Sequence, residues 1–410
     1  MSKVALAALA AAALLATGRP VLAQSSPPLP DGPGKETAAT YCNACHTLQS
    51  RVGAGYTAQG WDTVLRMMKN HGVEVPADEV AILRDYLVKH FPEKAKPEGV
   101  DRPGPAQIAI KVFTVPTPGS RPHDPLATRD GMIWYTGQMA NVLGRLDPNS
   151  GQFKEFPLKT PHSGPHGLKE DKDGNIWYTG NTGQLVGKLD PKTGEVTEYK
   201  MPDPNAKDPH SLAFDQSGIL WFSLQNSNMI GRLDPASGGI KLITVPTPKS
   251  RPYGIVVNSK GVPHVVLFGT NKIARIDPQT LDIKEYTLPD AGARPRRMAY
   301  TSDDAIWYTD YARGYIGRLD TATGEVKEWQ SPSGAKSEPY GISAIKDVIW
   351  YSESGTTPNT VVRFDPKTEK FQTWVIPGGG NIVRRTDVSP GGNFVMANSL
   401  VNAVSVAEIK

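Results

Sequence analysis

The chain has 410 residues, which is too long for one small domain and enough to bury a sizeable core. Its formal net charge is +4, and without Lys3 and Arg19 of the leader, which holds no acids, it is near +2 (4 − 2). This balance argues against a nucleic acid or another polyanion as partner. The 40 glycines and 36 prolines are typical of a chain with many tight turns.

A leader segment occupies residues 1–23. Lys3 supplies a charged start, Val4–Ala16 is apolar and rich in alanine, and Val21–Ala23 ends on a small residue. This order is typical of a secretory signal with cleavage before Gln24. The apolar run is too short to span a bilayer and the chain holds no other long one, so we expect an exported, periplasmic protein without a transmembrane anchor.

A small helical domain is expected at residues 35–93, after a linker rich in Pro, Gly and Ser at 24–34. Helical stretches are predicted at 35–42, near 60–70 and from 76 to about 91. The apolar faces of the last two are formed by Trp61, Val64, Leu65 and Met68, and by Val80, Leu83, Leu87 and Val88. This pattern indicates three short helices around a small core.

The motif Cys42-Asn43-Ala44-Cys45-His46 follows the first helical stretch. Its C-x-x-C-H spacing is the attachment signature of a c-type haem, in which each cysteine bonds one vinyl group and His46 binds the iron. Because Cys42 and Cys45 are the only cysteines, a redox pair or a disulfide is the alternative. A thioredoxin-like pair would lie in a βαβ pattern, which we do not find. We therefore predict one covalent haem c.

The sixth ligand of the iron is expected from the second helix. Met68 is the first choice and Met67 the second, while His71 would give ligation by two histidines. Alternatively, both methionines only pack against the porphyrin. The order C-x-x-C-H, Trp61-x6-Met68-x3-Gly72 and the helix EVAILRDYL resembles a small cytochrome c domain, and this resemblance implies Met68 as the axial ligand.

A second linker at 94–106, rich in Pro, Gly and charge, precedes a region of repeats. The basic residue of Gly-Arg-Leu-Asp-Pro recurs at intervals of 43, 44, 43, 43 and 45, at Arg145, Lys188, Arg232, Arg275, Arg318 and Arg363. Each unit has the pattern of four short strands, which is typical of a propeller blade. A seventh unit from about 381 has only three strands, and Ile108–Val115 can supply its fourth. The sequence therefore predicts a multidomain chain, an all-α cytochrome c domain followed by an all-β, seven-bladed propeller over 107–410.

The repeats carry Pro-His-Gly (165–167), Gly-Asn-Ile-Trp-Tyr-Thr (174–179), Gly-Arg-Leu-Asp-Pro and Gly-Glu-Val-x-Glu-Tyr. These motifs resemble the virginiamycin B lyase (streptogramin lyase) family of seven-bladed propellers across nearly all of 107–410. The resemblance implies a carbon–oxygen lyase that uses a histidine base, acidic residues and magnesium to eliminate across an ester. Most of the shared residues are scaffold residues, so they indicate the fold better than the activity.

The residue after the repeated proline is expected to line one mouth of the propeller channel. In blade order these residues are His123, His166, His210, Tyr253, Arg296, Tyr340 and, after Val383 in place of the proline, Arg384; Arg297 and Arg385 follow Arg296 and Arg384 directly. Convergent polar groups of this kind predict a ligand site, whose arginines favour an anionic or carbonyl-bearing ligand. The alternative is a turn motif whose rings bond only to backbone. Asp310 and Glu353, after the Trp-bearing strands, are candidates for an acid or base or for a metal ligand.

Three functions follow from these features. The first is an exported c-type cytochrome whose propeller binds a small-molecule substrate, which would make the protein an oxidoreductase, or a periplasmic redox partner. The second is a streptogramin lyase-like elimination enzyme with an accessory haem domain, the only case that calls for magnesium. Arg296 and Tyr340 stand on the late blades in place of histidine, which is a departure from the lyase pattern. The third is a binding module that docks another oxidoreductase.

Overall fold

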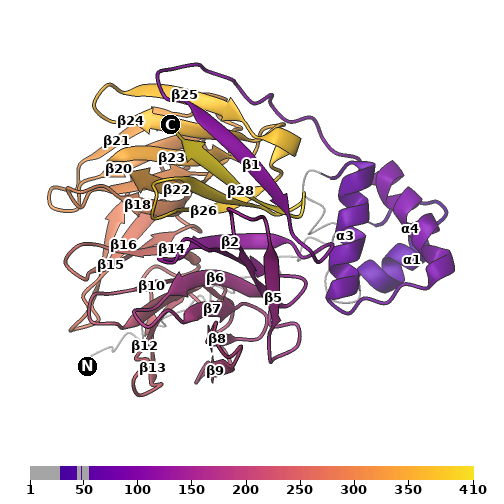
Figure 1. Ribbon diagram of the computed structural model, residues 1–410, viewed down its shortest axis with the longest axis horizontal. Helices are drawn as coiled ribbons and strands as arrows, with labels where there is room; N and C mark the ends of the chain where they lie inside the picture. The colour runs from indigo at the N-terminus through magenta and orange to yellow at the C-terminus, as the bar shows by residue number, and fades with distance from the viewer. Residues whose placement is uncertain (1–27, 44–47, 49–54) are drawn as a thin grey trace, which may run out of the picture.

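The computed structural model describes residues 28–43, 48 and 55–410. The predicted signal segment, Cys45 and His46 lie outside the described residues. Two parts are visible: a group of short helices at the N-terminal end and a ring of seven sheets (Figure 1).

The helical region begins with α1 (Lys35–Thr37), which continues as a π-helix, η1 (Ala38–Cys42). Two longer helices follow, α3 (Ala58–Asn70) and α4 (Ala77–His90). Their small core buries Ala38, Trp61, Leu83, Tyr86 and Leu87. The predicted core positions Trp61, Leu83 and Leu87 are confirmed, whereas Val80 of the predicted face is 39% exposed and Tyr86, outside that face, is buried.

The C-terminal end of α3 explains the glycine of the Trp-x6-Met-x3-Gly spacing. The Val73 N–H donates to the Met68 carbonyl at 3.0 Å, and Gly72 takes a φ of +91°. A 6→1 bond around a left-handed residue is the Schellman ending, for which glycine is the usual residue because it has no Cβ. The helix therefore ends at Asn70, with His71 as its C-cap.

Seven four-stranded antiparallel sheets form the ring, each ordered from its innermost to its outermost strand. Blades one to three contain β2 (Pro122–Ala127), β3 (Ile133–Gly137), β4 (Val142–Leu146), β5 (Phe153–Pro157), β6 (Pro165–Glu170), β7 (Ile176–Gly180), β8 (Leu185–Leu189), β9 (Val196–Lys200), β10 (Pro209–Phe214), β11 (Leu220–Leu224), β12 (Met229–Leu233) and β13 (Ile240–Thr244). Blades four and five contain β14 (Pro252–Val257), β15 (Pro263–Leu267), β16 (Lys272–Ile276), β17 (Ile283–Thr287), β18 (Pro295–Tyr300), β19 (Ile306–Asp310), β20 (Tyr315–Leu319) and β21 (Val326–Gln330). Blade six contains β22 (Pro339–Ile345), β23 (Val348–Glu353), β24 (Thr360–Asp365) and β25 (Lys370–Val375), and a short 3-10 helix, η2 (Pro377–Gly379), follows it.

The seventh blade closes the ring with strands from both ends of the propeller. Its inner strands are β26 (Val383–Val388), β27 (Phe394–Asn398) and β28 (Ala403–Ile409), and β1 (Ile108–Thr114) pairs antiparallel with β28. The predicted seven-bladed propeller and its closure by the strand near residue 108 are confirmed. This pairing ties the start of the propeller to its end and removes an open sheet edge.

The repeated motifs have packing roles. In each blade that has it, the Trp of the Ile-Trp-Tyr-Thr strand pairs with the basic residue of the neighbouring Gly-Arg-Leu-Asp strand. In blade two, for example, Trp177 of β7 is paired with Lys188 of β8. The five tryptophans are almost completely buried, as expected for residues that pack between sheets: Trp134, Trp177, Trp221, Trp307 and Trp350. The glycine of the second motif lies against an aromatic ring, because a Cβ on Gly187 would come within 2.1 Å of the Tyr178 ring.

Replacing Gly187 by alanine is expected to lower the free energy of unfolding by about 1–3 kcal/mol, because the added methyl group overpacks the sheet against Tyr178. Urea unfolding measures this loss. Gly391→Ala is the matched control, since a Cβ there meets only the Ser389 hydroxyl at 3.9 Å. Equal losses in the two variants would contradict the packing role of Gly187.

The segment 94–106, predicted as a linker, runs along the outer part of blade six. The Arg102 N–H donates to the Thr373 hydroxyl at 2.7 Å, and the Thr357 N–H donates to the Pro97 carbonyl at 3.0 Å. The Gln372 amide donates to the Ala106 carbonyl at 2.6 Å. Because the outermost strand of a blade leaves backbone and side-chain groups without a neighbouring strand, a Pro/Gly-rich segment can bond to them without forming a strand.

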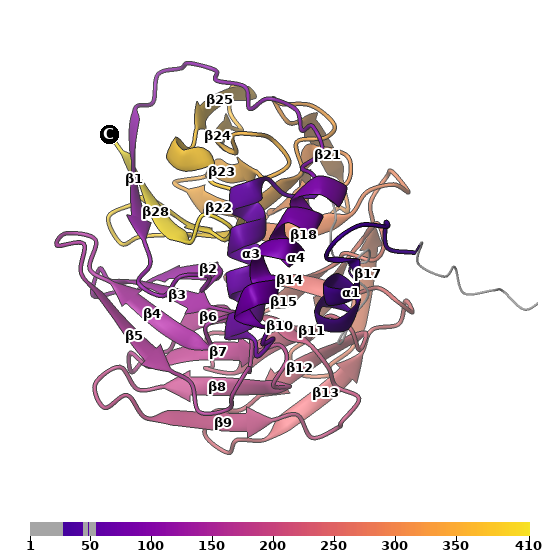
Figure 2. The same cartoon turned by 90° about the vertical axis from the view of Figure 1, so that its right-hand side faces the viewer.

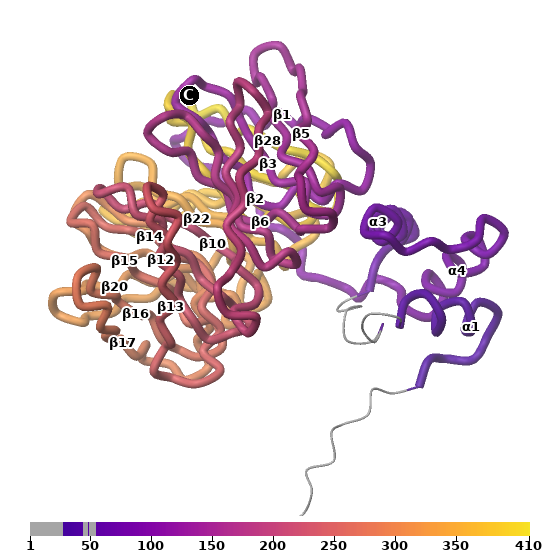
Figure 3. The backbone as a smooth tube through the Cα atoms, turned by 90° about the horizontal axis from the view of Figure 1, so that it is seen from below, coloured from indigo at the N-terminus to yellow at the C-terminus, as the bar shows by residue number. Residues whose placement is uncertain are grey.

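The helical region lies over one face of the ring (Figures 2 and 3). The Asn70 amide donates to the Pro118 carbonyl at 3.0 Å, and a Cβ on Gly119 would come within 2.9 Å of Arg66. The rings of His71 and His162 meet edge to face with centroids 5.3 Å apart. The propeller residues of these contacts belong to loops that lead into the inner strands β2 and β6, so the helices cover the face on which the inner strands begin.

No helix of the described residues is long and apolar enough to cross a membrane.

Candidate functional site

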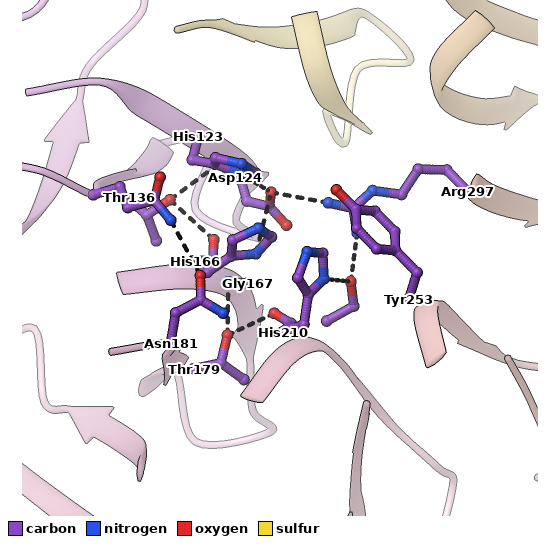
Figure 4. Close-up of polar contacts among 12 residues, drawn as sticks. His123, Asp124, Thr136, His166, Gly167, Thr179, Asn181, His210, Tyr253 and Arg297 are labelled. Carbon is purple, nitrogen blue, oxygen red and sulfur yellow. Dashed lines mark hydrogen bonds and ion pairs between the residues drawn. The ribbon is translucent and has the colours of Figure 1, made fainter. Parts of the chain in front are cut away.

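Four of the residues that follow the repeated prolines, those of blades one to four, meet at the start of the inner strands (Figure 4). Ring centroids are 3.8 Å apart for His123 and His166, 3.8 Å for His166 and His210, and 3.9 Å for His210 and Tyr253. We call these four rings the aromatic arc. It joins blades one to four, and its members are buried. The structure thus brings together the histidines that the sequence predicts at the channel mouth.

Arginines and tyrosines complete the ring on blades five to seven. The Arg296 guanidinium lies 3.9 Å from the ring centroids of both Tyr311 and Tyr340, an arrangement in which the π faces attract the cation. The hydroxyl groups of Tyr340 and Tyr253 share a hydrogen bond. Tyr340 therefore links the arginine half of the mouth to the aromatic arc.

A β-bulge lets two consecutive residues of each inner strand take part. In all seven blades the pairing of the inner strand with the next strand shifts register directly after the first residue, as between Pro122 and Pro125. A bulge places two residues opposite one and re-aims their side chains. Asp124, Ser211 and Arg297 take part in this way, each directly after an expected site residue.

Asp124 is the centre of the polar contacts among these residues (Figure 4). Its carboxylate lies 2.9 Å from the His123 Nδ1 and 3.4 Å from the Arg297 guanidinium. Arg297 is fully buried and also donates to the Ser211 hydroxyl at 2.5 Å. The repeat positions predict Arg297 but not Asp124 and Ser211, whose only signal is their place after a histidine that follows a repeated proline.

Hydroxyl groups of the second strands hold neighbouring blades in place. The Thr136 hydroxyl accepts from the Asp124 N–H at 3.0 Å and donates to the His166 carbonyl of the next blade at 3.0 Å. Thr179 repeats this pattern between Gly167 and His210 at 2.9 and 2.6 Å. The Thr of the Ile-Trp-Tyr-Thr motif therefore fixes the backbone of the residues that line the mouth.

The mouth is strongly cationic, and this shapes the titration of its histidines. Burial first, and then nearby positive groups such as Arg384 and Arg297, hold the pKa values of the arc histidines well below their usual range. Burial together with Arg384 lowers the pKa of Arg121 to about 10. Neutral imidazoles with lowered pKa values are weak proton acceptors at neutral pH.

One group of donors in the mouth has the spacing of a metal site. The donor atoms of His123, Asp124 and His166 lie within 4.8 Å of one another. However, the Asp124 carboxylate already bonds Arg297, and buried arginines surround the group. A cation would be repelled by these neighbours, so the residues do not fit a metal ion.

Asp310 and Glu353 do not join the mouth. Asp310 accepts from the Arg294 N–H at 2.9 Å and from the Arg313 guanidinium at 2.5 Å. Glu353 is fully buried and accepts from three hydroxyl groups at 2.6 Å, those of Ser331, Ser333 and Thr360. Both carboxylates are bound by donors of the protein itself, so they do not fit a magnesium ion or a free base.

The described part of the haem motif lies in the helical region. Cys42, at the end of η1, has no disulfide partner within the described ranges; it packs against the helical core, and burial raises its pKa to about 11. Met68 shares a helix face with Trp61, seven residues earlier. Met67 is buried, and its backbone lies beside the propeller: a Cβ added to Gly119 would come within 3.1 Å of the Met67 backbone N. His71 contacts His162 of the propeller.

Comparisons with known proteins agree with the propeller. The model of the virginiamycin B lyase family matches residues 100–363. A streptogramin B lyase structure is 28% identical, has a TM-score of 0.68, and covers 74% of this chain and 98% of its own. The virginiamycin B lyase from Staphylococcus aureus is 24% identical, with a TM-score of 0.68 and coverage of 74% and 99%. Comparison with curated proteins gives no match.

A further structure concerns a catalytically inactive variant of the Staphylococcus aureus virginiamycin B lyase, in which alanine replaces a histidine, with quinupristin. It is 22% identical to this chain, has a TM-score of 0.67, and covers 74% of this chain and 99% of its own. At this identity the likeness shows the fold alone.

Proposed function

The chain belongs to the virginiamycin B lyase family, and we propose that this member is an exported, periplasmic electron-transfer protein with a covalent haem c on its N-terminal helices. Its propeller mouth is the recognition site for a substrate or a redox partner. The observation that carries this proposal is the position of the helices. Through Asn70 and His71, α3 contacts the loops that lead into the inner strands, on the side where the aromatic arc lies. A redox group on these helices would lie close to whatever the arc binds.

The described part of the haem motif supports this proposal. Cys42 has no disulfide partner among the described residues, and it packs against the apolar core, where an attached porphyrin would be shielded from water. Cys45 would form the second thioether bond and His46 would be the proximal ligand. When bound, the group supplies one-electron transfer.

Within α3, Met68 is the methionine that we propose as the sixth ligand. It lies on the face of α3 that carries Trp61 and Leu65, and these two residues belong to or pack against the helical core. Met67 lies about 100° around the helix from Met68 and is buried beside the propeller. His71 faces His162, so its ring is engaged at the interface between the two parts.

The pyridine haemochrome spectrum of the chain, expressed with haem-maturation machinery, tests the proposal. We expect one c-type haem per chain, and none after Cys42→Ala together with Cys45→Ala. Met68→His is expected to lower the reduction potential, because imidazole in place of thioether ligation favours the oxidised iron. Met67→Leu is the matched control and is expected to leave the potential unchanged. A wild-type chain without covalent haem would overturn the proposal.

Elimination at an ester is the second candidate, favoured by the 28% identity to a streptogramin B lyase over 98% of that chain. Three buried, neutral imidazoles stand in the mouth as potential bases, although their lowered pKa values weaken them. Opening of a cyclic ester depsipeptide, followed with and without magnesium, tests this candidate. Loss of ring opening in His123→Ala, His166→Ala or His210→Ala would support it, and full activity in all three would count against a histidine base at the mouth.

A further inference from the structure

The channel mouth holds more positive charge than the chain can neutralise. Five guanidinium groups gather there, those of Arg121, Arg296, Arg297, Arg384 and Arg385. Within the described part of the chain, only Arg297 has a carboxylate within ion-pair distance, that of Asp124 at 3.4 Å. The residues outside the described ranges contain no Asp or Glu. Asp124 and Asp387 act on Arg385 through their charge without lying within ion-pair distance of it, so among the described residues Arg121, Arg296 and Arg384 are left without an ion-paired carboxylate.

The remaining contacts of the arginines leave donors without partners. In the described structure, the Nε atoms of Arg296, Arg297 and Arg384 are buried and have no hydrogen-bond partner. A buried guanidinium needs an acceptor as well as a counter-charge, since desolvation of an unpaired charge is costly. Aromatic faces attract Arg296, but they accept no proton from its Nε.

The same excess of positive charge lowers the pKa of Tyr340. Burial opposes its ionisation, yet Arg296, Arg384 and Arg297 outweigh this effect and lower its pKa to about 8. Its hydrogen-bonded neighbour Tyr253 has a pKa raised to about 12 by burial and by Tyr340 itself. The groups that face Tyr340 from the elements around it are Arg121, Tyr253, Arg296, Arg297, Tyr311 and Arg384. None of them carries a carboxylate.

We propose that the mouth is a carboxylate-binding site, in which Arg296, Arg297 and Arg384 hold an oxyanion that the polypeptide does not supply. Guanidinium groups bind carboxylates by charge-assisted and often bidentate hydrogen bonds. This proposal names the class of ligand that the recognition site binds, so it rests on the proposed function. The observations that support it come from the propeller residues alone.

Two sources could supply the carboxylate. One is a small dicarboxylate from solution. The other is the propionate pair of a haem c on the helices that cover this face, which contact the loop before Arg121 through Asn70. Both present the same group to the arginines, so the experiment must separate them.

Calorimetric titration with succinate tests the site in two forms of the full mature chain, at constant ionic strength adjusted with sodium chloride. The first form is the haem-loaded wild type and the second is the haem-free Cys42→Ala/Cys45→Ala variant. Binding by both forms assigns a soluble carboxylate to the mouth. Binding by the haem-free form alone assigns the mouth to the propionates. Absence of binding by the haem-free form overturns the proposal.

Arg384→Met gives the matching test of the residues. We expect its affinity for succinate to fall at least about tenfold, since one charge-assisted contact is lost. Lys111→Met removes an equal charge at an exposed ion pair with Glu408 and is expected to leave the affinity unchanged. Equal affinity in Arg384→Met and the wild type would overturn the assignment.

A pH series adds a readout that does not depend on a variant. Succinate and the Tyr340 phenolate compete for the same arginines, so succinate affinity is expected to weaken as the pH rises through about 8. By linkage, bound succinate shifts the tyrosinate absorbance titration to higher pH. An unchanged titration would contradict binding beside Tyr340. If the wild type carries no haem, electron transfer fails as a function, while the haem-free titration still decides on the carboxylate site.

Discussion

Replacing Asp124 by alanine is expected to lower the free energy of unfolding by about 3–5 kcal/mol, because it leaves Arg297 buried without any counter-charge. The Asp124 carboxylate lies within ion-pair distance of the Arg297 guanidinium, at 3.4 Å. It also shares a hydrogen bond of 2.9 Å with the His123 ring. Its removal adds one uncompensated charge to a site that already has an excess. Urea unfolding of the full chain measures the loss.

Two further variants separate charge from packing. Asp173→Ala removes an exposed carboxylate on a turn of blade two and is expected to change the stability by no more than about 0.5 kcal/mol. The double variant Asp124→Ala/Arg297→Met removes both partners and is expected to recover much of the loss, because no unpaired charge remains at this point. A double variant as unstable as the sum of its single variants would show that the pair is not the source of the effect.

Much of the propeller could be predicted because its determinants are local and repeated. The interval between Gly-Arg-Leu-Asp motifs sets the blade length, and the strand near residue 108 has no neighbour until the chain returns at β28. The second residues of the seven inner strands, which follow a proline in six blades and Val383 in the seventh, meet because every blade repeats the same geometry. His123, His166, His210 and Tyr253 therefore stack as their sequence positions predict.

Other features depend on neighbours that a pattern does not name. Asp124 faces the mouth only because of the bulge between Pro122 and Pro125, and alternation along a strand would send it to the other side. Its partner Arg297 comes from a strand 173 residues further along the chain. The position of α3 over the mouth is set by contacts such as that of Asn70 with Pro118. The Pro/Gly-rich composition of residues 94–106 does not indicate that α3 lies over the mouth.

Glu353 shows how an acidic residue can resemble a metal ligand in sequence and serve the scaffold in structure. Its position after a Trp-bearing strand made it a candidate for metal binding, yet donors from three residues and the Ser333 N–H at 2.9 Å occupy its oxygens. Glu353→Ala is therefore expected to destabilise the protein by about 3–5 kcal/mol, since several buried donors lose their acceptor together. Thermal and urea unfolding measure this loss.

The control for Glu353 lies on the same blade. Glu369 is exposed at a turn, and Glu369→Ala removes the same charge with an expected change of no more than about 0.5 kcal/mol. Magnesium provides the opposing test, because an ion that binds the folded protein would raise the melting temperature progressively as the magnesium concentration increases. We expect no magnesium-dependent shift in the wild type. A shift that disappears in Glu353→Ala would assign a bound metal to this carboxylate. Blade six would then be a candidate site for magnesium-dependent lyase chemistry.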